Sequence, residues 1–299
     1  MTHEPGDVVA DAYVLLSPIH RGGMGEVWRA APLGGTEVVA VKFIAPVLLD
    51  DETATQRLAI EASNMALVES RHVARLIDRG SDHLVMEYLE GESLAATLSR
   101  RVTLPSAEVA RLVGECADGL ATAHLAGVTH RDVKPSNIIL SPRGAVLTDL
   151  GISHALGQVP LTATGRVLGT AEYLAPELLT GTPASAASDV YALGICAFEA
   201  LTGKPPFRGA TALETAAAHV ERPVPPLPGD LPPFLRDLVS AMLAKDRAAR
   251  PTALRVGATA RELLDTAKTT RARNGPDTLG VDGGAPRPRS QHHSEEDQW

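Results

Sequence analysis

The sequence changes character at Gly91, and this change limits the possible folds more than any other feature of the chain. The residues before it contain one helical pattern, over 52–70, and several β-rich runs, at 13–19, 25–30, 37–43, 73–78 and 83–89. The residues after it are mainly helical in pattern. Strands gathered in one part of a chain and helices in the other are typical of an α+β fold. We therefore predict a small, mostly antiparallel sheet with one helix, followed by a larger and mainly helical part.

The helical part contains the clearest periodic pattern, over residues 106–126. Its apolar side chains fall on one face of a helix: Val109, Leu112, Val113, Cys116, Leu120 and Ala123. Gly127 follows as a C-terminal cap. Further helices are predicted at 175–180, 188–203, 232–244 and 252–267, and two short strands at 137–140 and 145–150. Residues 152–172 are rich in Thr and Gly, so we predict a long mobile loop there, of a length that is usually functional or disordered.

Composition excludes several classes of protein. The 299 residues are 44% apolar, enough for one large or two small cores, and the net charge of −8 argues against nucleic-acid binding. The two cysteines, Cys116 and Cys196, lie in apolar helical patterns, so we expect buried side chains and no disulfide. The N-terminus lacks the pattern of a signal peptide, and no stretch approaches the roughly 18 apolar residues of a membrane span. We therefore expect a cytoplasmic protein.

Five polar side chains of different chemistry lie within the run VTHRDVKPSNIIL, just before an apolar strand. They are His130, Arg131, Asp132, Lys134 and Asn137. A turn requires Pro, Ser or Asn, but it does not require an Arg, an Asp and a Lys. A solvated polar loop is the simple alternative, although the apolar residues on both sides indicate a loop packed against a core. The run is therefore a candidate functional site.

Asp149 ends the second short strand, in LTDLG, and gives this loop a chemical partner. Asp149 and Asn137 offer two hard oxygen ligands, which suit Mg²⁺ held together with phosphates. Asp132 could accept a proton from an attacking hydroxyl, and Lys134 could neutralise charge on a transferred group. Positioning, a metal ion and charge neutralisation are the parts that phosphoryl transfer requires.

A glycine-rich turn and a lysine-bearing strand stand near the start of the chain. The turn, IHRGGMGEV, has glycines that allow backbone N–H groups to approach phosphates, although glycine-rich hairpins without function are common. On the strand VVAVKF, Ala40 and Lys42 share a face because side chains alternate, and Val27 could lie on the same side. Glu61 lies among apolar neighbours on the predicted helix, so it requires a cation, and Lys42 is the natural candidate.

These motifs stand in the order of the protein-kinase signature set. The chain shows the glycine-rich loop, V-A-V-K, H-R-D-V-K-P-S-N, D-L-G and, at 175–177, A-P-E. It therefore resembles the bacterial, eukaryotic-like protein serine/threonine kinases. The resemblance implies a bilobal protein-kinase-like fold over residues 13–265, with an N-lobe at 13–90 and a C-lobe at 91–265. Residues 1–12 would form a short lead, and residues 266–299 read as a disordered polar tail.

The resemblance implies that the chain transfers the γ-phosphate of ATP to serine or threonine hydroxyls of proteins. Asp132 would be the catalytic base, with Lys134 beside it, while Lys42 would grip the α- and β-phosphates and pair with Glu61. Mg²⁺, with Mn²⁺ as an alternative ion, would be held by the metal ligands, Asn137 and Asp149. The backbone of Glu87 and Leu89, in the hinge segment MEYL, would bind adenine behind the gatekeeper Met86. The other expected nucleotide contacts are Ile19, Gly22, Gly23, Met24, Gly25, Glu26, Val27, Ala40 and Ile139.

Other matched residues would have structural or regulatory roles. Asp189 resembles the buried acid that holds the catalytic loop, Arg250 the arginine that pairs with Glu177, and Thr170 the threonine that contacts the loop aspartate and lysine. Arg131, next to the catalytic aspartate, is typical of kinases that are switched on by a phosphate on the activation loop. The expected autophosphorylation sites are Thr162 and Thr164; the alternative is that both are ordinary polar loop residues.

Two positions depart from the family pattern. His20 replaces the first glycine of the loop, which would stiffen it or alter nucleotide affinity without abolishing binding. D-F-G reads D-L-G, and we expect Leu150 to fill the packing role of the phenylalanine. The alternatives to an active protein kinase are a kinase-shaped scaffold and a small-molecule phosphotransferase, but the latter lacks the A-P-E segment. Expected partners are protein substrates, and the resemblance also allows a homodimer through the N-lobe, with neither nucleic acid nor a membrane span.

Overall fold

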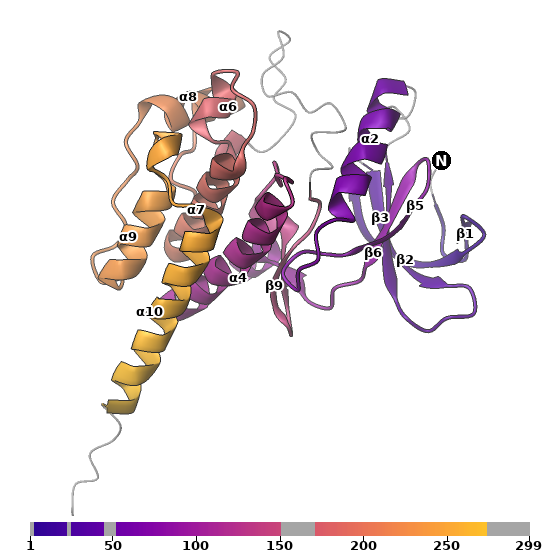
Figure 1. The fold of residues 1–299 in the computed structure, drawn as a ribbon, viewed down its shortest axis with the longest axis horizontal. Coiled ribbons are helices and arrows are strands. Elements are labelled where there is room, and N and C mark those ends of the chain that lie inside the picture. The colour runs from indigo at the N-terminus through magenta and orange to yellow at the C-terminus, as the bar shows by residue number, and fades with distance from the viewer. Residues whose placement is uncertain (1–2, 23–24, 45–51, 151–170, 274–299) are drawn as a thin grey trace, which may run out of the picture.

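The computed structural model describes residues 3–22, 25–44, 52–150 and 171–273 (Figure 1). Figure 1 shows a twisted sheet with one helix at one end of the molecule and a group of helices at the other. The predicted fold class, a small antiparallel sheet with one helix followed by a mainly helical lobe, is confirmed.

A six-stranded sheet with antiparallel neighbours forms the first lobe, in the order β1-β2-β3-β4-β6-β5. Its strands are β1 (Val8–Val9), β2 (Tyr13–Gly22), β3 (Gly25–Pro32), β4 (Val39–Ile44), β5 (Leu76–Arg79) and β6 (His83–Glu87). Helix α2 (Glu52–Met65) supplies the helix of this lobe.

Side chains of the central strands are divided between the two faces of the sheet. Val41 and Val85 pack with Trp28 on one face, in a cluster made by the strands alone. Leu84 and Met86 pack on the other face, in a cluster to which Ala62 and Met65 of α2 belong. The period of two in a strand produces this division, and it explains why β4 is buried along its whole length.

The second lobe combines a small sheet with helices. The sheet has the order β7-β8-β9, with β7 (Glu92–Ser93), β8 (Ile138–Ser141) and β9 (Gly144–Leu147). The α-helices are α3 (Leu94–Arg101), α4 (Ser106–Leu125), α6 (Pro176–Leu179), α7 (Ala186–Thr202), α8 (Ala212–Glu221), α9 (Pro233–Met242) and α10 (Ala253–Arg273). Short 3₁₀ turns occupy η1 (Pro135–Asn137), η2 (Ala171–Tyr173) and η3 (Arg247–Ala249).

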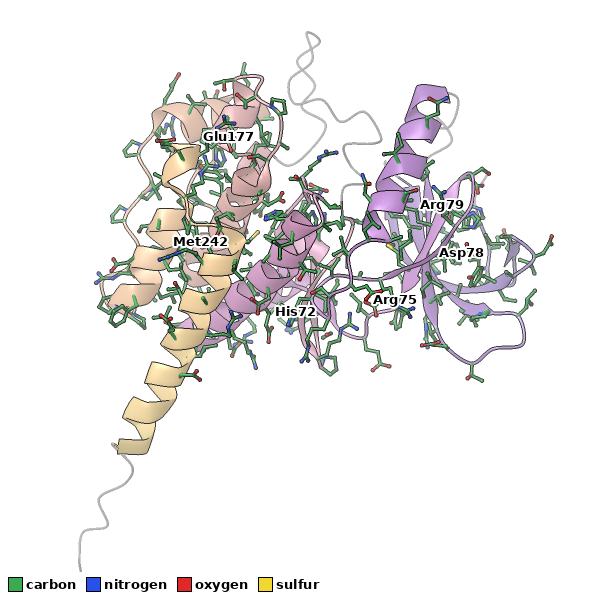
Figure 2. All side chains as sticks on the ribbon, in the orientation of Figure 1. His72, Arg75, Asp78, Arg79, Glu177 and Met242 are labelled. Carbon is green, nitrogen blue, oxygen red and sulfur yellow. The ribbon has the colours of Figure 1, made fainter. Side chains whose placement is uncertain are left out.

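Helix α7 is the centre of this lobe. Nearly every residue from Ser188 to Leu201 is buried, as its almost uniformly apolar sequence requires. Small residues allow the helices around it to approach closely: a side chain at Gly194 would come 3.0 Å from Cβ of Met242, which Figure 2 labels. The core around α7 is thus packed largely with small residues such as alanine, glycine and cysteine, because the chain has few aromatic residues.

The structure also differs from the sequence-based expectations. Helices α3 and α8 were not predicted, and both have side-chain caps: Ser93 accepts from the amide of Ala96, and Thr211 from that of Glu214. Their patterns are short or rich in alanine, so the periodic signal is weak. The helix predicted over 52–70 ends at Met65.

The expected boundaries of the domain fall inside ordered elements. Residues 1–12 were expected to be a lead, yet β1 lies in this segment and pairs with β2, and Val9 is buried. Helix α10 continues to Arg273, so the expected boundary at 265 lies within it. Its last eight residues, TAKTTRAR, favour the helix because they contain neither Gly nor Pro. Among the described residues, we find no helix with the length and apolar character that a bilayer crossing requires.

Candidate active site

A cavity of about 580 Å³ lies between the sheet and the second lobe. The sheet contributes Ile19, His20, Gly25, Val27, Ala40 and Lys42 to its walls. The hinge contributes Met86, Glu87 and Leu89, and the second lobe Asp132, Lys134, Asn137, Ile139 and Asp149. The motif residues that are far apart in the sequence therefore meet around one space.

The apolar wall follows from the strand register. Val27 of β3 lies opposite Lys42 of β4, and Ala40 lies two residues before Lys42, so all three side chains face the cavity as predicted. Lys42 is only 9% exposed, and its Nζ lies 2.7 Å from Oδ1 of Asp149. Burial would raise the pKa of the Asp149 carboxyl, but the charge and hydrogen bond of Lys42, together with nearby His130 and Lys134, outweigh it, so the pKa is lowered and the group is ionised.

The polar loop is held together by its own side chains. Oδ2 of Asp132 accepts hydrogen bonds from Nζ of Lys134 at 2.8 Å and from Nδ2 of Asn137 at 3.0 Å. Nδ2 of Asn137 also donates to the carbonyl oxygen of Asp132, at 2.9 Å. The carboxylate is thereby fixed at the edge of the cavity, between an amide and an ammonium group.

Asp189, in the first turn of α7, supports this loop from the buried side. Its carboxylate accepts from the backbone N–H groups of His130 and Arg131, both at 2.8 Å, and lies 2.8 Å from Nε2 of His124. Arg131 has a positive φ of 68°, a conformation that the carboxylate helps to stabilise. His130, whose amide donates to Asp189, is itself fully buried.

Glu177 and Arg250 form the expected pair away from the cavity. The guanidinium donates twice, from Nη1 to Oε1 at 2.7 Å and from Nη2 to Oε2 at 2.8 Å. Arg250 also donates to three backbone carbonyls and lies over the ring of Tyr191. Ser188 donates to the same carboxylate, at 2.8 Å, and Figure 2 labels Glu177 among the helices of this lobe. The pair connects α6 to the turn before α10.

Several expected site residues cannot be placed in this geometry. Gly23, Met24, Thr162, Thr164 and Thr170 lie outside the described residues. Glu61 belongs to α2, but its side chain is not described, so its pairing with Lys42 stays a prediction.

All residues of the glycine-rich turn at 19–27 except Gly23 and Met24 are described. Gly22 closes β2 opposite Gly25. The carboxylate of Glu26 accepts from Nε1 of Trp28 at 2.8 Å and lies 3.3 Å from Nδ1 of His3. Glu26 is thus engaged by neighbours on the sheet, and only its backbone remains a candidate for the nucleotide contact expected from the sequence.

The cavity includes residues that sequence reasoning did not identify. Ala74, Tyr88, Gly91, Ser93, Ser136 and Thr148 also line it. Arg143 does not line this cavity, but it donates twice to the Glu87 carboxylate from the turn between β8 and β9. Nothing in the local pattern of a turn such as SPRG signals a contact with a strand more than fifty residues earlier.

Comparisons with known proteins agree with this geometry. The protein kinase domain family matches residues 13–263. The chain is 40% identical over 260 residues to serine/threonine-protein kinase PknA of Mycobacterium tuberculosis, covering 84% of this chain and 60% of that protein. It is 35% identical over 254 residues to PknA of Corynebacterium glutamicum, covering 82% of this chain and 54% of that one. The chain thus spans little more than half the length of these relatives.

Solved structures agree as well. The crystal structure of a single mutant of the PknI kinase domain of Mycobacterium tuberculosis superposes with a TM-score of 0.69 at 26% identity. It covers 89% of this chain and all of the solved one. With a family match over most of its length and bacterial serine/threonine kinases among its relatives, the chain belongs to the protein kinase family.

Proposed function

We propose that this chain is an ATP-dependent protein serine/threonine kinase. The observation that carries the proposal is the meeting of Asp132, Lys134, Asn137, Asp149 and Lys42 at one cavity. A carboxylate for the proton, a lysine for the transferred group, two oxygen ligands and a buried lysine are the parts that phosphoryl transfer requires.

The cavity suits ATP in size and in lining. A volume of about 580 Å³ lies within the range of small-molecule sites, and its apolar walls at Val27, Ala40 and Ile139 suit a flat base. The backbone of Glu87 and Leu89 would bind the edge of adenine. Lys42 would bind the phosphates, which requires it to share its charge between them and Asp149.

Membership of the family implies a divalent metal ion, and the donor set of the site suits one. Asn137 turns its Nδ2 toward Asp132, so its Oδ1, which also accepts a hydrogen bond from Ser136 at 3.3 Å, is the atom that would bind a metal, and Asp149 supplies an ionised carboxylate. Hard oxygen ligands of this kind suit Mg²⁺, with Mn²⁺ as the alternative. When bound, the ion would neutralise the charge of the phosphates and orient them.

In the proposed reaction, the hydroxyl of a substrate serine or threonine attacks the γ-phosphorus. Its O–H bond breaks and the proton passes to Asp132, while the new P–O bond forms and ADP leaves. Lys134, which lies 2.8 Å from the Asp132 carboxylate, would stabilise the negative charge of the moving group. Asn137 keeps the carboxylate oriented.

Regulation is proposed from the resemblance. Phosphate on Thr162 or Thr164 would pair with Arg131, Thr170 would contact the catalytic loop, and Glu61 would pair with Lys42. A homodimer through residues 13–90 and a cytoplasmic location also stay predictions.

The test is autophosphorylation of the chain with Mg²⁺ and ATP, followed by mass spectrometry, with Asp132→Asn as the comparison. We expect phosphate on Thr162 or Thr164 in the unaltered chain and a rate lower by roughly 10²- to 10⁴-fold in the variant, because the proton acceptor is lost. Absence of phosphate from both proteins, with nucleotide binding retained, would contradict the proposal and favour a kinase-shaped scaffold.

A further inference from the structure

The hinge of this chain is held by an ion pair that reaches it from the second lobe. Oε2 of Glu87 accepts from Nη1 of Arg143 at 3.0 Å, and Oε1 accepts from Nη2 at 2.6 Å. The amide of Arg75 donates a third hydrogen bond to the same carboxylate, at 3.0 Å. Glu87 lines the large cavity, so the three donors fix a residue that the nucleotide would contact.

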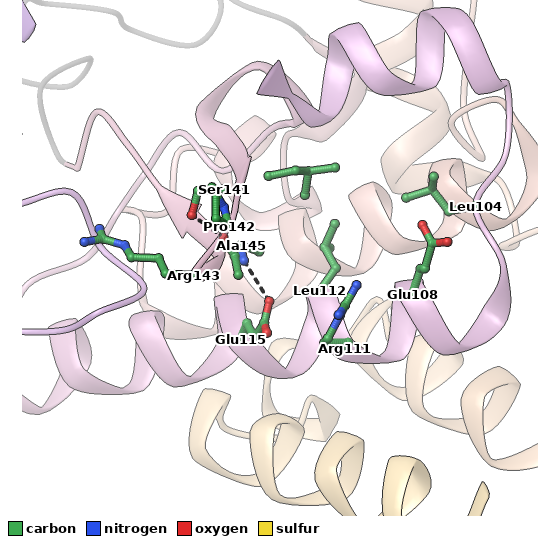
Figure 3. Close-up of a pocket in the computed structure, with 11 residues that line it drawn as sticks. Leu104, Glu108, Arg111, Leu112, Glu115, Ser141, Pro142, Arg143 and Ala145 are labelled. Carbon is green, nitrogen blue, oxygen red and sulfur yellow. Dashed lines mark hydrogen bonds between the residues drawn. The ribbon is translucent and has the colours of Figure 1, made fainter. Parts of the chain in front are cut away.

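The turn that carries Arg143 is itself firmly anchored. The amide of Ala145 donates to Oε2 of Glu115 on α4 at 2.7 Å, a hydrogen bond that is drawn as a dashed line in Figure 3. The carbonyl of Arg143 accepts from Nη2 of Arg71 at 2.9 Å, and Ser141 bonds to the carbonyl of Gly144 across the turn. This turn also borders a second cavity, of about 220 Å³, on the side of α4 (Figure 3). The backbone of the turn from which the Arg143 side chain extends is therefore fixed by hydrogen bonds.

The loop after α2 joins the same network. Nδ1 of His72 lies 2.9 Å from the carbonyl oxygen of Ala145, and the carbonyl of His72 accepts from the amide of Leu147 at 2.9 Å. The amide of Ala74 donates to Leu147 in turn, at 2.8 Å. Figure 2 labels His72 and Arg75 along this loop. The hinge, this loop and the β8–β9 turn are thus bound to one another.

The environment of the pair distinguishes it from the other bidentate pairs on the surface. The side chains of Arg143 and Glu87 are 35% and 19% exposed, whereas those of Arg101 and Glu108, also bidentate, are 40% and 39% exposed. Burial would raise the pKa of Glu87, but the hydrogen bonds from Arg143 and from the amide of Arg75 lower it, so the carboxylate stays ionised. Screening by water is weaker for the less exposed pair, and its loss leaves a carboxylate short of partners.

We infer that Arg143 is a positioning residue for the nucleotide, acting through Glu87 to hold the hinge backbone in the orientation that receives the base. The inference rests on the proposed kinase function, because the ligand of the hinge is the nucleotide. A purely structural ion pair would contribute to folding in the same way whether or not the cavity were filled. A positioning residue must instead change the affinity for the nucleotide more than the rate of the chemical step.

The test uses the full chain and four variants: Arg143→Ala, Arg143→Lys, the exchanged pair Glu87→Arg with Arg143→Glu, and the control Arg101→Ala. Calorimetric titration with a non-hydrolysable ATP analogue and Mg²⁺ gives Kd. ADP formation at varied ATP gives KM and kcat, and thermal unfolding of each variant gives Tm. The control removes a bidentate arginine of the same lobe whose carboxylate partner is Glu108, away from the hinge.

We expect Arg143→Ala to raise Kd and the KM for ATP by roughly threefold to tenfold, with a smaller change in kcat. Arg143→Lys keeps the positive charge but cannot form the bidentate pair, so it should give an intermediate Kd. The exchanged pair should recover part of the affinity. Arg101→Ala should leave Kd unchanged.

Two results would overturn the inference. One is a Kd of Arg143→Ala equal to that of the control, with only Tm lowered, which assigns the pair to folding alone. The other is a raised kcat at unchanged Kd, which makes the pair a restraint on lobe movement. If the unaltered chain binds no nucleotide, the proposed function fails and the inference with it. If it binds nucleotide and only the variants fail to differ, the proposed function stands.

Discussion

Lys42 and Asp149 lie in contact across the cavity, with 2.7 Å between Nζ and Oδ1. One residue belongs to the sheet and the other follows β9 in the second lobe. The pair therefore joins the two lobes at the place where the phosphates of ATP would lie. Removing either member leaves a buried charge without this partner, so the first prediction concerns this contact.

Substitution Lys42→Ala should lower kcat/KM for ATP by roughly 10²- to 10³-fold, because a positive group aimed at the phosphates is lost. The measurement is the steady-state rate of ADP formation at varied ATP. As a matched control, Lys204→Ala removes a lysine of the second lobe that the cavity does not include. Equal kinetics for both variants would exclude the role proposed for Lys42.

Asp189→Ala should destabilise the chain and inactivate it together. The backbone N–H groups of His130 and Arg131 would lose their acceptor, and each buried donor without a partner costs about 1–3 kcal/mol. Denaturant unfolding measures the first effect, and autophosphorylation of the folded variant measures the second. A folded variant of unchanged stability would show that water replaces the carboxylate without cost.

The pair Glu177–Arg250 should make stability depend on pH in acid. Burial would raise the pKa of Glu177, but the hydrogen bonds from Arg250 and Ser188 lower it below its ordinary value of 4.5. Because the pKa in the folded state lies below that in the unfolded state, the stabilisation is complete above about pH 4.5. It is lost as the pH falls through the lower, folded value.

The free energy of unfolding, measured between pH 6 and pH 3, checks this expectation. The unaltered chain should lose more stability on acidification than Glu177→Gln, which has no proton to gain at that site. At pH 6 the glutamine variant should be the less stable of the two by roughly 3–5 kcal/mol, because it leaves the buried Arg250 without its counter-charge. Parallel pH profiles would show that the pair does not control acid stability.

The segment before residue 13 should contribute to folding. Val9 is 8% exposed and Val8, its neighbour on β1, is 53% exposed, so the two form a matched pair. Val9→Ala should lower the free energy of unfolding by about 1–2 kcal/mol, and Val8→Ala should have little effect. Chemical denaturation of both variants is the measurement, and equal effects would mean that β1 does not pack as described.

The grouping of the candidate site residues around one cavity was predictable from the sequence. Asp132, Lys134 and Asn137 stand close together in the chain, and the register of two adjacent strands brought Val27 and Lys42 to the same face. Cys116 and Cys196 are fully buried, as their apolar neighbours indicated. In each case, local spacing determines where the side chain points.

The features that the sequence did not predict depend on contacts between residues that are far apart in the chain. The sequence of the turn that contains Arg143 does not indicate a contact with Glu87. The hydrogen bonds that hold Arg143 come from three separate segments of the chain. Helix α8 is rich in alanine, so its buried face has little contrast with the exposed one. The end of α2 at Met65 has no strong stop signal in the residues that follow.

Because Asp189 belongs to α7, the loop that contains Asp132 should stay ordered only as long as the helical core is folded. The Asp189 carboxylate is held by α7, whose residues from Ser188 to Leu201 are nearly all buried, and it binds the amides of the loop. The amides of residues 130 and 131 should therefore exchange their hydrogens as slowly as those in the middle of α7. Heating should then abolish activity and unfold the core in the same transition. Core substitutions far from the cavity should lower activity by reducing the folded population.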